Sequence, residues 1–205
     1  MKKLTLFLTA AVSLFLFSCG TKPADSVAEN KEAVPAESQP ADTVKDEKQI
    51  AVVYFSATGH TRMAAGQIAE LCGADLFEIV PAEPYAEEDL NYHDESTRAT
   101  LEQKDPAARP AIASGPFDLS EYQVLVLGYP IWWGQAPRIM NTFVEQYDFG
   151  DQLIIPFCTS ASSPIADSAE YLQELSKGGR WQAGTRFSAA VTMEELQAWL
   201  ETVMP

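Results

Sequence analysis

The chain has 205 residues, of which 46% are hydrophobic and 21% charged, a composition typical of one globular domain with accessory segments. Its formal net charge is -15, and residues 1–48 hold six lysines against seven acidic residues, so -14 belongs to residues 49–205. A domain this acidic is poorly suited to nucleic acid or an anionic membrane surface, and we expect neither as a partner.

The N-terminal 48 residues have the pattern of an exported, tethered protein. Lys2 and Lys3 precede an apolar stretch from Leu4 to Phe17, which is typical of an export signal (1–18) rather than a spanning helix. The segment 16–19 resembles the lipobox of bacterial lipoproteins, which implies lipidation of Cys19; ordinary cleavage is the alternative. Residues 19–48 contain no aromatic residue and predict a flexible tether. We therefore expect an exported protein, held at a cell-envelope membrane by its lipid alone, with a domain at 49–205.

The first predicted element of that domain is a buried strand over the apolar run 50–55, and a helix over about 62–72 follows it. The turn between them consists of Ser56, Ala57, Thr58, Gly59, His60 and Thr61. Unpaired N–H groups and the helix dipole favour an anion at a helix N-terminus, the hydroxyls add donors, and glycine permits close backbone approach. We interpret this turn as a site for the phosphate of a mononucleotide. A plain helix cap by Thr58 or Thr61 is the alternative.

Two other phosphate-binding motifs are excluded. The phosphate loop of nucleotide triphosphatases needs Lys before its final Ser/Thr, and here His60 precedes Thr61. The dinucleotide fingerprint G-x-G-x-x-G is absent, because Gly59 is the only glycine in the turn.

Apolar runs and helical patterns alternate through the rest of the chain. Further strands are predicted at 74–80, 122–127, 153–157 and 185–191. Helices are predicted up to about Lys104, from Pro137, around 165–172, and after a capping box of Thr192 and Glu195. This alternation predicts an α/β fold with a doubly wound, parallel, five-stranded sheet. The loops 56–61, 128–135 and 158–163 all follow strands and are expected at the same edge of the sheet, where such folds bind ligands.

Cysteine and histidine point to no further chemistry. Cys72 and Cys158 have no disulfide-framework spacing and are expected to be small buried thiols. There is no C-x-x-C motif and the two histidines are isolated, so we expect no metal site.

Taken together, the three loops resemble those of a flavodoxin-like FMN-binding domain, and the resemblance runs from about residue 49 to the end. In that family an S/T-x-T-G-x-T loop wraps the FMN phosphate, a loop after strand three supplies an aromatic wall, and a loop after strand four closes over the ring edge. The resemblance implies strand order 2-1-3-4-5 and FMN as cofactor. The implied cofactor-binding residues are Ser56, Ala57, Thr58, Gly59, His60, Thr61, Pro130, Ile131, Trp132, Trp133, Gly134, Thr159, Ser160, Ala161 and Ser162.

Two departures from the family pattern affect the function. Many flavodoxins cover the second face of the ring with a Tyr in the strand-four loop, where this chain has only Thr, Ser and Ala. Tyr85, Tyr92 and Tyr129 are substitutes, although a surface or core position is the simpler expectation for each. Ala161 also stands where related sequences often have Gly. An open second face would admit a small oxidant such as a quinone.

The leading hypothesis is therefore an FMN-binding, flavodoxin-like protein that mediates electron transfer in the cell envelope. Its partner would be a redox protein or a small-molecule oxidant, and no catalytic residue is assigned. The alternatives are an FMN-dependent NAD(P)H:quinone or nitro-group reductase, and a cofactor-free scaffold module with the same fold. The acidic domain disfavours a reduced, anionic flavin and so predicts a low reduction potential.

Overall fold

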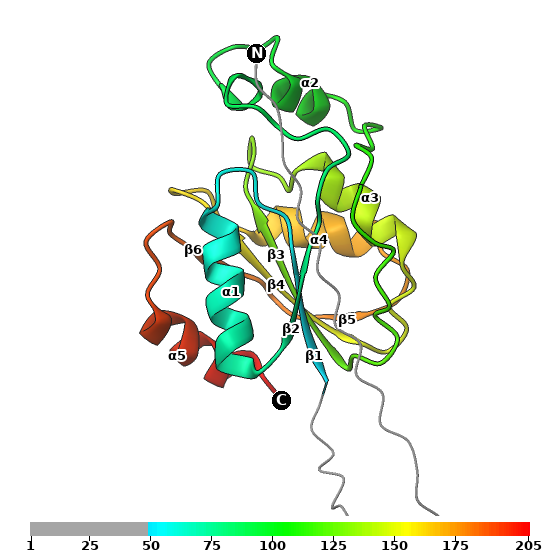
Figure 1. Ribbon diagram of the computed structural model, residues 1–205, viewed down its shortest axis with the longest axis vertical. Coiled ribbons are helices and arrows are strands. Elements are labelled where there is room, and N and C mark those ends of the chain that lie inside the picture. Colours follow the sequence, from blue (N-terminus) through cyan, green and yellow to red (C-terminus); the bar gives the residue numbers. More distant parts are fainter. Residues whose placement is uncertain (1–48) are drawn as a thin grey trace, which may run out of the picture. The chain divides into compact units, whose positions relative to one another are not determined.

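The computed structural model describes residues 49–205, which form one sheet with helices against both of its faces (Figure 1). The predicted signal (1–18), the predicted tether (19–48) and Cys19 lie outside the described residues.

All strands of the sheet are parallel to their neighbours. The strands are β1 (Ile50–Tyr54), β2 (Asp75–Glu78), β3 (Val124–Pro130), β4 (Leu153–Thr159), β5 (Arg180–Trp181) and β6 (Thr185–Phe187). Their order is β2-β1-β3-β4-β5, and β6 also pairs with β4. The predicted doubly wound sheet and its strand order 2-1-3-4-5 are confirmed.

Four of the five α-helices in residues 49–205 cover the two faces of the sheet in pairs. The helices are α1 (His60–Cys72), α2 (Arg98–Lys104), α3 (Arg138–Gln146), α4 (Ala166–Leu175) and α5 (Met193–Val203), with a short 3₁₀ helix η1 (Glu88–Leu90). Alternate strand residues face opposite sides: Val52 and Ile155 belong to the core beneath α1 and α5, whereas Val53 and Ile154 belong to the core beneath α3 and α4. Because both faces are buried, the central strands are continuously apolar, as the sequence predicted.

The fifth strand position differs from the prediction of one strand at 185–191. Two short strands occupy it, β5 beside residues 153–154 of β4 and β6 beside residues 157–159. The carbonyl of Ile154 accepts from the N–H of Gln182 at 2.9 Å, so the residue two further on, Pro156, has its backbone nitrogen on the same side. Proline has no N–H to donate, and the ladder is interrupted there. Glycine fits closely at position 184, beside this break. A Cβ there would lie 2.5 Å from Ile165 and 3.1 Å from Pro156, so a larger residue would force its neighbours to shift.

Strands three and four are longer than predicted. We expected β3 to end at Leu127 and β4 at Phe157, but they continue to Pro130 and Thr159. Their extension depends on Gly128, which pairs with Phe157 and whose Cβ, if present, would lie 2.3 Å from that ring. The strands therefore carry the first residues of the predicted binding loops into the sheet itself.

Two helices, α3 and α5, begin close to the predicted positions. The capping box before α5 is present: Thr192 Oγ1 accepts from the N–H of Glu195 at 3.2 Å, and the Glu195 carboxylate accepts from the N–H of Thr192 at 2.9 Å. Pro137 stands at the N-cap of α3. Local helix-start signals were thus sufficient here.

The connection between β2 and β3 is the longest in the domain. Its helix α2 ends at Lys104, as predicted, and lies beyond the carboxyl ends of the strands (Figure 1). On the return path, Ala113 donates to Val80 at 2.8 Å and Phe117 packs on Phe77 of β2 with ring centroids 5.1 Å apart. The connection therefore covers both the carboxyl edge of the sheet and the outer side of β2.

The two cysteines of the domain, both expected to be small buried thiols, differ in their burial. Cys72 and Cys158 are free thiols, and Cys158 is fully buried whereas Cys72 is only partly so. Within residues 49–205, no helix combines the length and apolar character needed to span a membrane.

Candidate functional site

The turn after β1 leads directly into α1 without a side-chain cap. Gly59 is the N-cap residue, with φ at +91°, and its N–H donates to Ser56 Oγ at 3.1 Å. No side chain in the described part of the chain caps this helix, and its first turn has no acidic residue. The simple capping role considered for Thr58 or Thr61 is therefore wrong. The first-turn N–H groups remain available to an anion.

Thr61 and Thr159 join two of the predicted loops. Their hydroxyl oxygens lie 2.7 Å apart, and the residues are only 1% and 5% exposed. This bond links the first turn of α1 to the end of β4 across the carboxyl edge of the sheet. One of the two hydroxyls donates to the other, which leaves a second hydrogen for another acceptor.

Arg62 is engaged away from the turn. Its guanidinium forms an ion pair with Glu78 of β2, and Tyr54 donates to the same carboxylate at 3.0 Å. The bond to Glu78 raises the pKa of Arg62, while burial is the main cause of a raised pKa at Tyr54. Any phosphate at this turn would therefore be held by hydroxyl and N–H donors.

The loop after β3 contains a tight turn that projects Trp133. Trp132 and Gln135 exchange backbone hydrogen bonds of 2.9 and 3.0 Å, with Trp133 and Gly134 at the corner. Both corner residues have positive φ, +49° and +77°, the sign pattern of a type I′ turn. Trp133 is the one non-glycine residue with positive φ between residues 49 and 205. Such a conformation costs about 1–3 kcal/mol and is characteristic of functional sites.

The two adjacent tryptophans have different environments. Trp132 is half-buried and meets Phe55 and Tyr85 edge-on, with ring centroids 5.6 and 5.1 Å apart. Trp133 is 45% exposed. Trp132 therefore belongs partly to the core, as the alternative to a ligand contact allowed, whereas packing does not account for Trp133.

Tyr85 helps to hold this aromatic cluster in place. Its hydroxyl donates to Glu102 at 2.5 Å, and the guanidinium of Arg98 lies 4.1 Å from its ring centroid. Burial, followed by the bond to Glu102, raises the pKa of Tyr85 well above its ordinary value, so the phenol keeps its proton and remains a donor.

A cavity of about 330 Å³ lies between the first turn, the tryptophan loop and the β2–α2 connection. Its lining residues are Thr58, Leu90, Tyr92, Ala99, Ile131, Trp132 and Trp133. A more open hollow of about 610 Å³ shares Thr58, Leu90 and Tyr92 with it and adds Glu87, Glu88 and Asn91. The structure thus brings together two of the three predicted loops on one mostly apolar cavity, the usual character of a small-molecule site.

The strand-four loop takes less part in this cavity than expected. Ser160 bonds the carbonyl of Ser163, its N–H donates to Phe187 at 3.1 Å, and Ala161 and Ser162 are exposed. Arg186 donates to the carbonyls of Ser160 and Ala161 at 2.9 and 3.2 Å. None of Thr159, Ser160, Ala161 and Ser162 lines the cavity, although the N–H of Ile131 donates to Thr159 at 3.1 Å. The loop is a neighbour of the site.

Two cavity residues, Leu90 of η1 and Ala99 of α2, are not predicted from the sequence, because residues 81–121 carry no readable pattern beyond a short helix. Tyr92 is expected only as a substitute cover, with a surface or core position as the simpler expectation; it is 69% exposed and also lines the cavity. The available signal was a lone aromatic pair, Tyr92-His93, in an acidic loop.

Other chemistry is not indicated at this edge. Among residues 49–205, no group of three or more His, Cys, Asp and Glu side chains is arranged to hold a metal ion. Burial raises the pKa of the Cys158 thiol to about 12, against the opposing charge of Arg186, so this thiol is a poor nucleophile. His60, the first residue of α1, is exposed, and no side-chain hydrogen bond to another of residues 49–205 orients it for proton transfer.

A doubly wound parallel sheet with an uncapped helix N-terminus and an aromatic loop at its carboxyl edge defines a class of ligand-binding α/β domains. Comparison with known proteins places the chain within that class. The family described as flavodoxin matches residues 49–203, and the chain belongs to this family.

Solved structures agree with this assignment. A protein from Bacteroides uniformis is 40% identical, with 75% of this chain and 98% of that chain covered and a TM-score of 0.72. One from Bacteroides eggerthii is 38% identical, with 77% and 98% covered and a TM-score of 0.71. The description of both as flavoproteins is itself provisional.

A more distant structure shares the fold. The flavoprotein from Lactobacillus acidophilus in complex with FMN is 20% identical, with 68% of this chain and 93% of that chain covered and a TM-score of 0.56. Curated proteins give no match to the chain.

Proposed function

We propose that this protein binds FMN at the carboxyl edge of its sheet and transfers electrons in the cell envelope. One observation carries the proposal: Thr58, from the turn that opens at the uncapped N-terminus of α1, lines the same cavity as Trp132 and Trp133. A polar end and an aromatic wall in one cavity match a ligand with a phosphate and a planar ring.

The residues present fit FMN. The phosphate would meet the first-turn N–H groups and the hydroxyls of Ser56 and Thr58, at the positive end of the helix dipole. Thr61, fixed by Thr159, has a hydroxyl beside the same turn. The ring would lie against the tryptophan loop, where aromatic contact gives a large binding area at little entropic cost. The complex of the Lactobacillus acidophilus relative with FMN supports this choice of cofactor.

FMN supplies redox chemistry, and the residues of this chain position and shield it. The apolar lining from Ile131, Leu90 and Ala99 excludes water from the ring, and the bonds that hold Trp132 and Tyr85 fix the wall before the cofactor arrives. No titratable side chain lines the 330 Å³ cavity apart from the phenol of Tyr92. Binding, orientation and exclusion of water are therefore the tasks of the protein.

The charge at the mouth favours a carrier over an NAD(P)H-driven reductase. Glu87 and Glu88 line the hollow that opens beside the cavity, and no basic residue is among the residues that line either space. The phosphates of NAD(P)H would approach two carboxylates without a compensating cation, which costs binding energy. A basic redox protein would be attracted to the same surface.

The cofactor is tested by titrating the purified protein with FMN and, separately, with riboflavin, which lacks the phosphate. We expect a yellow complex with FMN and an affinity for riboflavin at least a hundredfold weaker. A protein whose visible spectrum and fluorescence respond to neither compound would refute FMN binding. Equal affinity for both would refute the phosphate role of residues 56–61.

Carrier and reductase are separated by steady-state kinetics. We expect the FMN-loaded protein to oxidise NADH and NADPH no faster than free FMN does when a soluble quinone is present. Rapid, saturable NAD(P)H oxidation would establish the reductase instead. If the protein binds no flavin at all, the remaining alternative is a cofactor-free scaffold module.

The envelope location is tested at Cys19. If the thiol is lipidated, Cys19→Ser abolishes incorporation of labelled fatty acid and moves the protein from the membrane fraction to the soluble fraction. Unchanged fractionation of this variant would contradict the lipid anchor.

A further inference from the structure

Segment 87–99 contributes three lining residues to the cavity, and one of them is an aromatic side chain left largely in water. Ala99 is buried, whereas Tyr92 is 69% exposed and lines both the cavity and the hollow beside it. The ring of His93 lies 4.1 Å from that of Tyr92, centroid to centroid. A large aromatic group at the rim of an apolar cavity has area to bury when a planar ligand enters.

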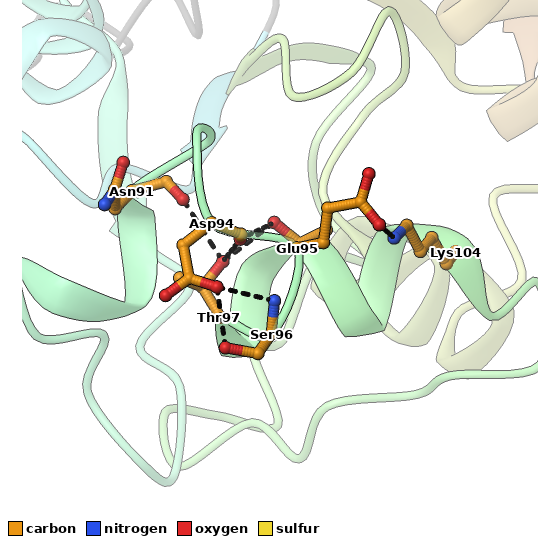
Figure 2. Close-up of polar contacts among 7 residues, drawn as sticks. Asn91, Asp94, Glu95, Ser96, Thr97 and Lys104 are labelled. Atoms are coloured by element: carbon orange, nitrogen blue, oxygen red, sulfur yellow. Dashed lines mark hydrogen bonds and ion pairs between the residues drawn. The ribbon is translucent and has the colours of Figure 1, made fainter.

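The turn that carries Tyr92 is held by a buried pair of hydroxyl groups. Thr97 Oγ1 and Thr100 Oγ1 lie 2.7 Å from each other, and each lies 3.1 Å from the carbonyl oxygen of Asp94 (Figure 2 shows the turn and Thr97). The Asp94 carboxylate accepts from the hydroxyl and the N–H of Ser96, and these bonds lower its pKa. Thr97 and Thr100 are 9% and 3% exposed. The turn is therefore held in shape by hydrogen bonds within the protein itself.

The helix α2, which begins at the end of this segment, is fastened to the tryptophan loop. Gln103 of α2 donates from Nε2 to the carbonyls of Trp132 and Ala136, at 2.8 and 3.2 Å. Arg138 donates in turn to the carbonyl of Gln103 at 2.9 Å. Gln103 and Arg138 are 9% and 8% exposed. Buried bonds thus hold α2 against the tryptophan loop, and little ordering of these two elements is required when a ligand enters.

We propose that Tyr92 stacks on the face of the bound flavin ring that the tryptophan loop leaves uncovered. The inference rests on the proposed binding of FMN. In this chain the β2–α2 connection, rather than the strand-four loop, would cover the second face of the ring. Ala161 and Ser162 of the strand-four loop offer no aromatic ring and do not line the cavity. With both faces covered, the ring exchanges electrons through its edge and excludes a stacked quinone.

The test compares Tyr92→Leu, Tyr92→Phe and Leu101→Ala in FMN titrations. Leu101 is a matched control, because it is 55% exposed on α2 and does not line the cavity. We expect Tyr92→Leu to bind FMN about tenfold more weakly, in line with the energy of aromatic–base stacking. Tyr92→Phe keeps the affinity because the ring, not the hydroxyl, makes the contact, and Leu101→Ala behaves as the wild type.

Visible circular dichroism of the bound flavin provides a readout that affinity alone does not. We expect the flavin band to change in Tyr92→Leu and to be retained in Tyr92→Phe, with thermal midpoints of the cofactor-free proteins equal because Tyr92 is mostly exposed. Affinity within twofold of the wild type and an unchanged band in Tyr92→Leu would overturn the inference while FMN binding stands. A wild-type protein that binds no FMN would overturn both.

Discussion

At the scale of single residues, the conformation of Trp133 separates its contribution to stability from its proposed contribution to FMN binding. The residue is 45% exposed and has φ at +49°, so its indole adds little to the core while its backbone is strained. The neighbouring Trp132 packs edge-on against Phe55 and Tyr85 and is required by the core.

We therefore predict opposite effects for the two tryptophans. Trp133→Gly relieves the strain and stabilises the cofactor-free protein by about 1 kcal/mol, yet weakens FMN binding at least tenfold. Trp132→Ala destabilises the fold by about 2–4 kcal/mol, since a partly buried indole is lost. Urea unfolding and FMN titration of both variants check this. A Trp133→Gly protein that binds FMN as tightly as the wild type would show that the strained turn has another cause.

The buried thiol of Cys158 links stability to pH. Its pKa is raised to about 12 in the folded protein, while an unfolded thiol titrates near 8.5. Because the folded pKa is the higher one, the stabilisation is complete below about pH 8.5 and is lost as the pH rises towards 12.

We predict that the parent protein loses about 1.5 kcal/mol of unfolding free energy through this thiol between pH 8.5 and pH 10, and that Cys158→Ala does not show this loss. The measurement is urea unfolding across this range for Cys158→Ala and for its parent, both carrying Cys72→Ala so that the second thiol does not contribute. Parallel pH curves for the two proteins would contradict the assignment. The constant offset from the smaller side chain does not affect the slope.

At the scale of elements, α5 is fixed at its start by the capping box and along its length by aromatic packing. Trp199 meets Phe187 and Phe157 edge-on, with ring centroids 5.2 and 6.2 Å apart. The capping box therefore holds the first turn of the helix, and the three packed aromatic rings hold the rest of it.

Removing the cap should cost stability without affecting the site. We predict that Thr192→Ala lowers the free energy of unfolding by about 1 kcal/mol and that Thr192→Asp, which retains an acceptor, restores most of it. FMN affinity should be unchanged in both, because α5 contributes no residue to the cavity. Equal unfolding midpoints for Thr192→Ala and the wild type would show that the helix does not depend on this bond.

The elements also show which features a sequence can reveal. The turn at residues 56–61, the capping box and the proline at the start of α3 are local signals, and each predicted its element correctly. Pro156 was read only as part of a strand, although its missing N–H interrupts the strand beside it; that effect depends on a pairing far along the chain. Tyr92 is indeed exposed, but the sequence does not reveal that it also lines the cavity, because only the folded β2–α2 connection brings it to the carboxyl edge.

At the scale of the whole molecule, the negative charge of the domain bears on the proposed electron transfer. Carboxylates oppose a reduced, anionic ring: at an effective dielectric of about 20, a charge ~10 Å away contributes roughly 1.7 kcal/mol before screening. Because these carboxylates are at the surface, dissolved salt screens their repulsion of the ring.

We predict that salt raises the reduction potential of the bound flavin. Between about 10 mM and 1 M salt the screening length falls from roughly 30 to 3 Å, which removes most of the repulsion from surface carboxylates. Spectroelectrochemical titration at the two concentrations measures the shift, and Glu87→Gln with Glu88→Gln should reduce it. A potential that is independent of salt in the wild type would rule out the surface charge as its cause.

The interrupted ladder beside Pro156 has a consequence for how copies of this protein behave in crowded solution. Open sheet margins are templates on which another polypeptide can add a strand and start a fibre. Here one margin is divided into pieces of two and three residues, and the other is covered by the returning β2–β3 connection. Within residues 49–205 the sheet therefore gives a second molecule too short a template for edge-to-edge growth, and we expect the domain to resist amyloid-like polymerisation.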